Sequence, residues 1–450
     1  MNNLSRISLR LLIAAAAISL LVAAIFLLVD YLKIKNSFPN GTFIGEVDVS
    51  LLDRDEAIEK IEKAPVTAFI RDVIFQNPAN TGESFSFLPQ EVGAYILPGE
   101  TVDNAFDLTH NENYIRDLRK RLSREALMLP ARLSLDETLA TQVLSDLSQK
   151  INSPAKDSSV ILDEETGGYH ITPDSPSRLL RPADTLVNAK KQLYKGESVI
   201  PLAIDYLGQP RVTEKMLRAA PPVHRLSAFT TYYGAHDSPN RIHNIKLIAS
   251  WINNTLLLSN EVFSLLNVIG DFSEERGFKE AYVIMSGELV PELGGGTCQI
   301  GTTLYNTVAL ADLDVLSRRN HSFFFNIYPL GRDATVYPGQ VDFKFKNNTG
   351  HPILLKALAT NRKLSFRIYG TPTGKTIEFS NPSIFILGES GVYQPSTLRA
   401  VISLDRPFRT TVTRTVKDSG GNIIKEETIR SFYKLYGDKT NVPIKRPESR

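Results

Sequence analysis

The N-terminal segment is the feature that most restricts how this chain of 450 residues can fold. Residues 11–29 carry no charged side chain and only one hydroxyl group, and they are bounded by Arg10 and Asp30. A helix needs roughly 20 apolar residues to cross about 30 Å of hydrocarbon. Residues 1–39 are therefore predicted to form a short cytoplasmic tail and a transmembrane anchor, with the bulk of the chain outside the cytoplasm.

A cleaved signal peptide is the alternative interpretation of this segment. Signal peptides end in a cleavage site of small residues, whereas this apolar run leads directly into Asp30 and Tyr31. Positive charges on the two sides of the run are nearly balanced, so they favour a cytoplasmic N-terminus only slightly. We therefore prefer an uncleaved, single-pass anchor.

The remaining composition describes a folded, multidomain protein. Hydrophobic residues make up 42% of the chain, enough for several cores. The 51 basic and 49 acidic side chains leave a net charge of +2, which gives no electrostatic reason to expect a nucleic-acid partner. The single cysteine, Cys298, excludes an intrachain disulfide, and the histidines lack the spacing of metal ligands. We predict neither a metal nor another cofactor.

Hydrophobic periodicity predicts an α+β multidomain fold. A strand at 42–49 and a helix at 53–64 open an α+β region, 40–215, in which stretches 85–105 and 169–189 look alike and suggest an internal duplication. A second α+β domain is predicted at 226–370. Its helices, 246–258 and 298–313, are followed by strands at 323–328, 341–345, 352–357, 364–369 and 376–380. Short links between these strands predict an antiparallel sheet.

The C-terminal part is predicted to be a β-rich extension, residues 371–440, with a frayed tail at 441–450. Strands at 410–417 and 423–430 flank the sequence Asp-Ser-Gly-Gly, which is typical of a hairpin turn. We assign this extension to a region separate from the domain that carries Cys298.

The surroundings of Cys298 are typical of an activated nucleophile. Three consecutive glycines and Thr297 precede it, at the start of the predicted helix 298–313. Free N–H groups and the dipole at a helix N-terminus stabilise a thiolate and lower its pKa. Glycine also lets the backbone approach a ligand closely, so the N–H groups of Gly295 and Gly296 could form an oxyanion site.

His321 is the candidate base, because a helix of about four turns and a short return bring it back toward the cysteine. Asp333 could orient the imidazole or could equally cap a turn. Most free cysteines are small buried hydrophobes, and only the combination with the glycines and the histidine favours a nucleophile. Candidate substrate-binding or oxyanion residues are Gly295, Gly296, Thr297, Gln299, Thr302, Arg241 and Arg332.

Several blocks of sequence, in this order, resemble the VanW family. They are Asn240-Arg241 with Asn244-Ile245, Glu261-Val262-Phe263-Ser264, Gly294-Gly295-Gly296-Thr297-Cys298-Gln299, Thr302-Thr303-Leu304-Tyr305-Asn306, His321-Ser322, Gly331-Arg332-Asp333-Ala334-Thr335-Val336 and Asp342-Phe343-Lys344-Phe345-Lys346-Asn347. The resemblance covers about residues 226–358. Region 40–215 is similar to the peptidoglycan-binding modules that commonly precede this domain, and the extension is similar to a G5 domain.

The resemblance implies a cell-wall protein linked to glycopeptide resistance, with an L,D-transpeptidase-like activity in which Cys298 is the nucleophile. Two departures stand out. The widespread L,D-transpeptidase signature Ser-x-Gly-Cys-[Ile/Val]-Arg is absent, so the carboxylate-binding residue of that family cannot be transferred. Gly301 occupies a position where VanW proteins usually carry serine.

Together these features predict a membrane-anchored enzyme outside the cytoplasm of a bacterial cell, acting on peptidoglycan stem peptides. Glycan and the membrane are the other expected partners, and the oligomeric state is not predicted. One alternative is a non-catalytic wall-binding or scaffold protein, in which Cys298 is only a packed core residue. Another is a cysteine peptidase or amidase that cuts the same stems.

Overall fold

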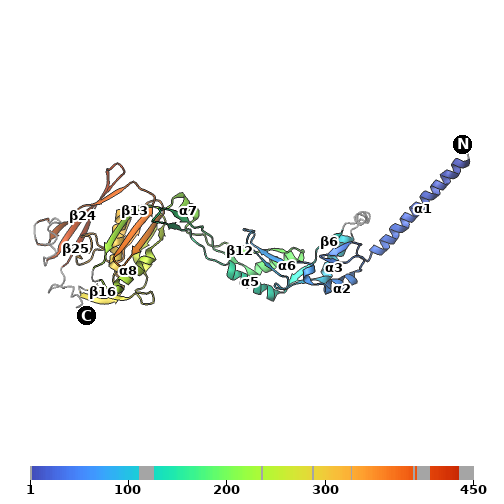
Figure 1. The fold of residues 1–450 in the computed structure, drawn as a ribbon, viewed down its shortest axis with the longest axis horizontal. Helices are drawn as coiled ribbons and strands as arrows, with labels where there is room; N and C mark the ends of the chain where they lie inside the picture. The colour runs from blue at the N-terminus through green and yellow to red at the C-terminus, as the bar shows by residue number, and fades with distance from the viewer. Residues whose placement is uncertain are drawn as a thin grey trace. The chain divides into compact units, whose positions relative to one another are not determined.

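The computed structural model describes residues 3–110, 126–234, 237–285, 288–325, 327–388, 391–392 and 406–434. The predicted tail, 441–450, lies outside these residues. Helix α1 (Asn3–Ile34) contains a stretch, Leu12–Lys33, that is long and apolar enough to cross a membrane (Figure 1). The predicted α+β class is confirmed, because several small sheets are interspersed with helices along the chain.

The chain divides into two compact units whose limits differ from the predicted domain boundaries. Unit 1 comprises Met1–Lys156 and Pro176–Gln209, and unit 2 comprises Asp157–Ser175 and Pro210–Arg450. A hairpin of β8 (Val160–Leu162) and β9 (Tyr169–Ile171) is thus part of unit 2, although its sequence lies inside the predicted N-terminal region. The hairpin contributes Val160 and Ile171 to a small core shared with Leu354 and Tyr369.

Beyond α1, the described residues of unit 1 form short strands and amphipathic helices around one apolar core. Its elements are β1 (Thr42–Ile44), β2 (Val47–Asp48), α2 (Arg54–Lys63), β3 (Val73–Gln76), β4 (Ser84–Phe87), β5 (Ala94–Ile96), α3 (Pro98–Thr109), β6 (Leu127–Leu129), β7 (Leu133–Leu135), α5 (Glu137–Ile151), β10 (Leu179–Leu180), α6 (Pro182–Tyr194), β11 (Val199–Pro201) and β12 (Ile204–Asp205). Its sheets have the orders β2-β1-β6, β11-β3-β4, β5-β7 and β10-β12.

Within unit 1 the order β5-α3-β6-β7 recurs as β10-α6-β11-β12, and in both sets the first and last strands pair antiparallel. The two helices also begin alike, with proline at the first position. The hydroxyl of Thr101 in α3 accepts the N–H of Arg132 at 2.9 Å, and Thr185 in α6 accepts the N–H of Ala203 at 3.0 Å. The two helix-to-strand connections are thus built alike, whereas β9, at the start of the second stretch, belongs to unit 2. An internal duplication stays a prediction.

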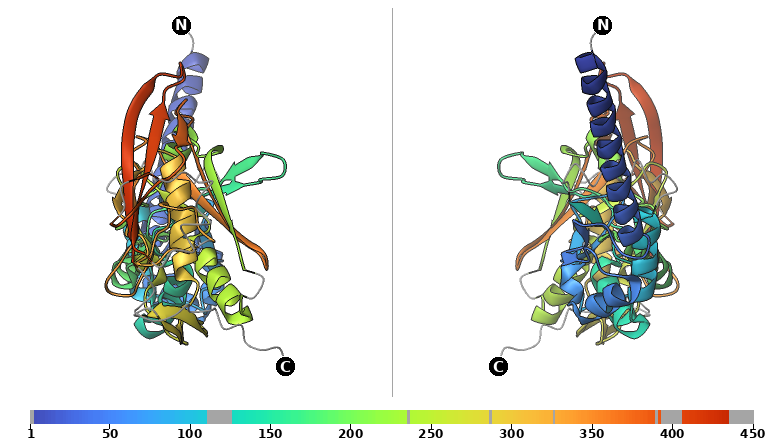
Figure 2. Two further views of the ribbon diagram at one scale, coloured as in Figure 1. Left: turned by 90° about the vertical axis from the view of Figure 1, so that its left-hand side faces the viewer. Right: turned by 90° about the vertical axis from the view of Figure 1, so that its right-hand side faces the viewer.

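Unit 2 has a four-stranded antiparallel sheet at its centre, in the order β13 (His224–Tyr232), β21 (Lys363–Gly370), β20 (Ile353–Ala359) and β14 (Thr255–Leu257). Helices α8 (Pro239–Ile252) and α10 (Thr297–Leu310) pack against the sheet and against each other (Figure 2). Ile300, Leu304 and Val308 form the buried stripe of α10 that contacts this core. α10 lies close to its predicted position, 298–313. The prediction of 246–258 was shifted, because α8 begins at Pro239 and ends at Ile252, and Thr255–Leu257 form β14 instead.

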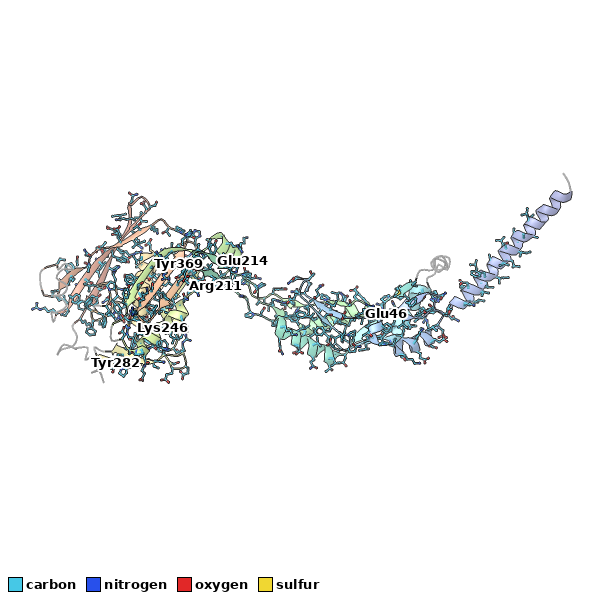
Figure 3. The ribbon with its side chains drawn as sticks, in the orientation of Figure 1. Glu46, Arg211, Glu214, Lys246, Tyr282 and Tyr369 are labelled. Atoms are coloured by element: carbon cyan, nitrogen blue, oxygen red, sulfur yellow. The ribbon has the colours of Figure 1, made fainter. Side chains whose placement is uncertain are left out.

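The other elements of unit 2 lie around this core. They are α7 (Glu214–Ala219), β15 (Val262–Ser264), α9 (Leu265–Ile269), β18 (Asp314–Ser317), β19 (Lys344–Lys346) and a hairpin of β16 (Glu280–Met285) and β17 (Glu288–Leu293). Tyr282 on β16 is exposed (Figure 3).

The C-terminal extension is a four-stranded antiparallel sheet of β22 (Thr376–Phe379), β23 (Ser383–Ile386), β24 (Phe408–Lys417) and β25 (Ile423–Tyr433). β24 and β25 form the predicted hairpin, which is longer than the sequence indicated. The extension shares a core cluster with Leu330 and Phe324, so it packs on the segment that follows His321.

The predicted strand at 323–328 is not formed in the part of it that the structure describes. Phe324 contacts the rings of Phe408 and Tyr433, whereas Phe325 packs edge-on against His321 at 4.9 Å. Neighbouring aromatic residues thus serve two different clusters, and the chain takes an irregular path to reach both.

Candidate active site

Cys298 lies in the first turn of α10, whose N-cap is Gly296 with φ +111°. The backbone N–H groups of Gly295, Gly296 and Cys298 donate to no acceptor among the described residues. Gly296 and Cys298 line a cavity of about 830 Å³, whereas Gly295 does not. The start of this helix therefore has two unpaired N–H donors on residues that line the cavity.

Close packing gives a second reason for the three glycines. A Cβ at Gly295 would lie 2.7 Å from the Cβ of Ala281, and one at Gly296 would lie 2.7 Å from Ile245. A Cβ at Gly294 would overlap the ring of Phe272. Side chains at these positions would push the start of α10 away from its neighbours.

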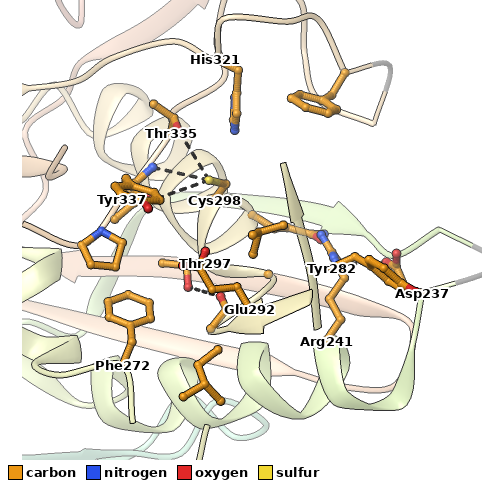
Figure 4. A pocket seen from close by; sticks show the side chains of 18 of the residues that line it. Asp237, Arg241, Phe272, Tyr282, Glu292, Thr297, Cys298, His321, Thr335 and Tyr337 are labelled. Carbon is orange, nitrogen blue, oxygen red and sulfur yellow. Dashed lines mark hydrogen bonds and ion pairs between the residues drawn. The ribbon is translucent and has the colours of Figure 1, made fainter. Parts of the chain in front are cut away.

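The sulfur of Cys298 has three polar neighbours on the segment after Asp333. Its Sγ atom lies 3.5 Å from the hydroxyl of Thr335 and 3.5 Å from both the N and the O of Val336. The imidazole of His321 points toward the same sulfur (Figure 4). The thiol is only partly exposed, so a substrate reaches it through the cavity.

Asp333 holds His321 in place through one oxygen of its carboxylate. Oδ2 accepts the Nδ1–H of His321 at 2.6 Å and its backbone N–H at 2.7 Å. Both side chains are buried, and Tyr328 stacks on the imidazole at 5.5 Å. The second nitrogen of the ring is therefore free to face Cys298, as in a cysteine–histidine–aspartate arrangement.

The other oxygen of Asp333 is bound by a residue of the extension. The hydroxyl of Tyr433 donates to Oδ1 at 2.6 Å, and Nη2 of Arg318 lies 3.5 Å from the same oxygen. Burial raises the pKa of Asp333, but its hydrogen bond with His321 and the charge of His321 outweigh this effect and lower the pKa. Asp333 is ionised at neutral pH.

The electrostatics of the site favour a thiolate–imidazolium pair. Burial raises the pKa of Cys298, but the charge of His321 and hydrogen bonds from His321, Val336 and Thr335 together lower it to about 7. Burial lowers the pKa of His321, and the negative charge of Cys298 and the hydrogen bond to Asp333 raise it to about 9. Between these two values the thiol is deprotonated while the imidazole is protonated.

Arg241 and Gln299 both line the cavity, and they contact each other. The guanidinium of Arg241 donates to Asp237 at 2.8 Å and to the side-chain oxygen of Gln299 at 2.8 Å. Gln299 is fully buried and donates in turn to the hydroxyl of Thr231. Gln299 thus fixes Arg241 at the cavity wall, where the charge of Arg241 is paired with Asp237.

The remaining predicted binding residues have other positions. Thr297 lines the cavity, but its hydroxyl donates to Gly294 O at 2.6 Å, within the glycine-rich turn that precedes α10. Thr302 lies away from the cavity and bonds both the N and the O of Ala334. Arg332 also lies away from the cavity, with its guanidinium 4.3 Å from the centre of the Phe379 ring.

Sequence reasoning missed several residues that complete the site. Thr335 and Val336 come two and three residues after Asp333, so their place in the same motif was an available signal. Arg318 was not among the predicted site residues, and it donates to the backbone oxygens of Asp333 and Gly331. Nothing in the sequence pointed to Tyr433, which lies 100 residues beyond Asp333.

Comparison with known proteins identifies two parts of the chain. A family model described as "VanW like protein" matches residues 240–369, and one described as "Putative peptidoglycan binding domain" matches residues 85–200. The predicted resemblance to these two families is confirmed, while the G5-like character of the extension stays a prediction. Cys298, His321 and Asp333 all lie within the VanW-like domain.

Two curated proteins are similar to part of the chain. Uncharacterized protein YoaR of Bacillus subtilis is 36% identical over 162 residues, which are 36% of this chain and 53% of that protein. Vancomycin B-type resistance protein VanW of Enterococcus faecalis is 25% identical over 158 residues, 34% of this chain and 58% of that protein. The chain thus spans little more than half of each relative, and no solved structure matches it. These similarities support a cell-wall-associated protein.

Proposed function

We propose that unit 2 is a cysteine acyltransferase that acts on peptidoglycan stem peptides, in the manner of an L,D-transpeptidase. The observation that carries this proposal is the arrangement of the thiol of Cys298, the imidazole of His321 and the carboxylate of Asp333 beside a cavity. A cysteine kept as thiolate next to an imidazolium is suited to attack an amide carbonyl. A merely packed cysteine would need neither partner.

The first half-reaction forms a thioester. The thiolate of Cys298 attacks the carbonyl carbon of the third residue of a donor stem, and the N–H groups of Gly296 and Cys298 stabilise the oxyanion. The carbon–nitrogen bond then breaks as His321 gives its proton to the leaving amine, which departs as the terminal D-alanine. Asp333 keeps the imidazole oriented during this transfer.

The second half-reaction regenerates the thiolate. The amine of a neighbouring stem attacks the thioester carbonyl, and His321 takes the proton that this amine loses. The carbon–sulfur bond breaks and a new amide joins the two stems. Water in place of the amine would give hydrolysis, which is the activity of a cysteine peptidase or amidase.

The rest of the chain fits an enzyme held at the wall. The match of residues 85–200 to a peptidoglycan-binding family supports unit 1 as a module that binds glycan or stems. The apolar stretch Leu12–Lys33 supports a single-pass anchor in the bacterial cell membrane, which leaves both units outside the cytoplasm.

The test is product analysis with detergent-solubilised full chain and a disaccharide-tetrapeptide. We expect stem dimers joined through the third residue of the donor, together with free D-alanine, detected by mass spectrometry. Cys298→Ala is expected to abolish both products, whereas Ser250→Ala, an exposed change on α8, is expected to leave them unaffected.

The other outcomes select the alternatives. Shortened stems without dimers would replace the transferase proposal with a peptidase or amidase. Equal product formation by the Cys298→Ala variant, or binding to peptidoglycan without any product, would favour a wall-binding scaffold.

A further inference from the structure

We infer that the C-terminal extension is part of the active site, with Tyr433 as a positioning residue for the Asp333–His321 pair. This inference rests on the proposed function only for the role of His321 as the group that donates and accepts protons. Its geometric basis is a series of contacts that runs from β25 through Asp333 and His321 to Cys298.

Tyr433 is the last residue of β25 and is 1% exposed. Its hydroxyl donates to Oδ1 of Asp333 at 2.6 Å and accepts the N–H of Gly331 at 3.1 Å. Its ring lies 5.1 Å from that of Phe408, in the core cluster of the extension. The packing of the ring against Phe408 thus sets the position of the hydroxyl, and the hydrogen bonds with Asp333 and Gly331 set its direction.

The hydroxyl matters because the two oxygens of Asp333 have different partners. Oδ2 accepts the backbone N–H and the Nδ1–H of His321, and Oδ1 accepts the hydroxyl of Tyr433. Arg318 lies 3.5 Å from Oδ1 and is the competing cation. Without the hydroxyl of Tyr433, the carboxylate is free to rotate toward Arg318, and His321 loses its aligned acceptor.

Other contacts hold the extension against the segment that carries His321. The N–H of Lys434 donates to Ser322 O at 2.7 Å, and the side chain of Asn320 donates to Phe432 O at 2.8 Å. The residues on both sides of His321 are thus bound to the end of β25. A module that merely followed the catalytic domain would not require these bonds.

Titratable and charged groups around this network come from several elements. Besides Arg318, they are the thiol of Cys298 on α10, the phenol of Tyr328 stacked on the imidazole, and the Arg241–Asp237 pair on the cavity side. The substitution Tyr433→Phe changes none of them. A change in the titration of Cys298 in this variant would therefore report on the orientation of Asp333 and His321.

The experiment measures the alkylation rate of Cys298 by iodoacetamide as a function of pH in the full chain. Cys298 is the only cysteine, so all label reports on this thiol. In Tyr433→Phe we expect the midpoint of the profile to rise by at least about half a pH unit, since a misaligned imidazolium stabilises the thiolate less. Dimer formation should fall about tenfold.

Phe408→Leu is the matched control, because it trims the same core cluster without contacting Asp333. Its midpoint is expected to match the wild type even if its melting temperature falls. An unchanged midpoint in folded Tyr433→Phe, or an equal shift in Phe408→Leu, would overturn the inference. The alkylation assay needs no substrate, so a wild type without transferase activity would refute the proposed function and leave this result standing.

Discussion

The two units differ in how deeply their ion pairs are buried. In the described part of unit 1 the most buried ion pair, Arg178–Glu83, retains side-chain exposures of 24% and 23%, and Arg71–Glu46 lies at the surface. In unit 2, Arg414 and Asp312 are 3% and 7% exposed, and His321 and Asp333 are 10% and 5% exposed. Unit 2 thus buries two ion pairs near the helix that carries the thiol, in addition to its exposed ones such as Arg218–Glu214.

This difference fits the proposed division between a wall-binding module, unit 1, and an enzyme, unit 2. Burying an ion pair costs desolvation energy that its attraction only partly returns, so buried pairs contribute little to net stability. They are expected where a fixed orientation or a shifted pKa is needed. In unit 2, one buried pair orients the imidazole beside Cys298, and the other holds the opposite end of α10.

The largest expected effect is on the stability of unit 2 when Arg414 is removed. Arg414 donates to Ala309 O at 2.9 Å and to Asp312 at 2.6 Å, so Arg414→Ala leaves a helix end and a buried carboxylate with fewer partners. We expect a loss of about 3 kcal/mol in the free energy of unfolding of unit 2. Urea denaturation followed by the fluorescence of Trp251, the only tryptophan and a unit 2 residue, measures it.

Arg71→Ala in unit 1 is the matched change at an exposed ion pair. Its effect on unit 1, followed by hydrogen exchange of unit 1 peptides, is expected to stay below about 1 kcal/mol. Equal losses in the two variants would remove the contrast between the units.

The next largest expected effect is on the rate of acylation, whose pH dependence should differ from that of wall binding. Thioester formation needs the thiolate of Cys298 and the imidazolium of His321 together. The thiolate is lost as pH falls through about 7, and the imidazolium is lost as pH rises through about 9. The rate of acylation should therefore peak near pH 8 and fall about tenfold per unit on either side of the window.

Wall binding by the chain should not follow this curve. Sedimentation with purified peptidoglycan sacculi is expected to give the same bound fraction across the window from about pH 7 to about 9. A rate that keeps rising above pH 9 would argue against a role for the imidazolium. A bound fraction that peaks together with the rate would assign wall binding to unit 2 instead.

The smallest expected effects come from two glycines in helices. A Cβ at Gly301 in α10 would lie 2.7 Å from a methyl group of Val336, whose N–H contacts the sulfur. Gly301→Ala is expected to destabilise unit 2 by about 1 kcal/mol, because overpacking exceeds the gain in helix propensity. Gly99 in α3 has open space at this position, so Gly99→Ala should stabilise unit 1 by about 0.5 kcal/mol. Trp251 fluorescence for unit 2 and hydrogen exchange of unit 1 peptides show whether each variant is stabilised or destabilised.

The sequence was informative wherever the signal was local. The apolar run of α1, the periodicity of α10 and the turn residues of the β24–β25 hairpin each predicted an element near its observed position. The placement of Cys298 in the first turn of α10 followed from the three glycines. The close neighbours of those glycines were not predictable, because Phe272, Ala281 and Ile245 are distant in the chain.

The sequence was least informative wherever tertiary packing determines the position of a side chain. Arg332 lies in the same motif as Asp333, yet its contact with Phe379 of the extension keeps it away from the cavity. The extension was assigned to a separate region because its sequence predicts mainly strands and is similar to a G5 domain. Only the fold shows that Tyr433 reaches Asp333.

The central claim is that Cys298 carries the acyl group, and intact-mass spectrometry tests it most directly. The full chain is incubated near pH 8 with a tetrapeptide stem that lacks an acceptor amine, then quenched in acid. The account predicts added mass equal to the donor minus its terminal D-alanine, located on Cys298 by peptide mapping and absent from Cys298→Ser. Undiminished release of D-alanine by a chain whose Cys298 is already blocked by iodoacetamide would contradict the account.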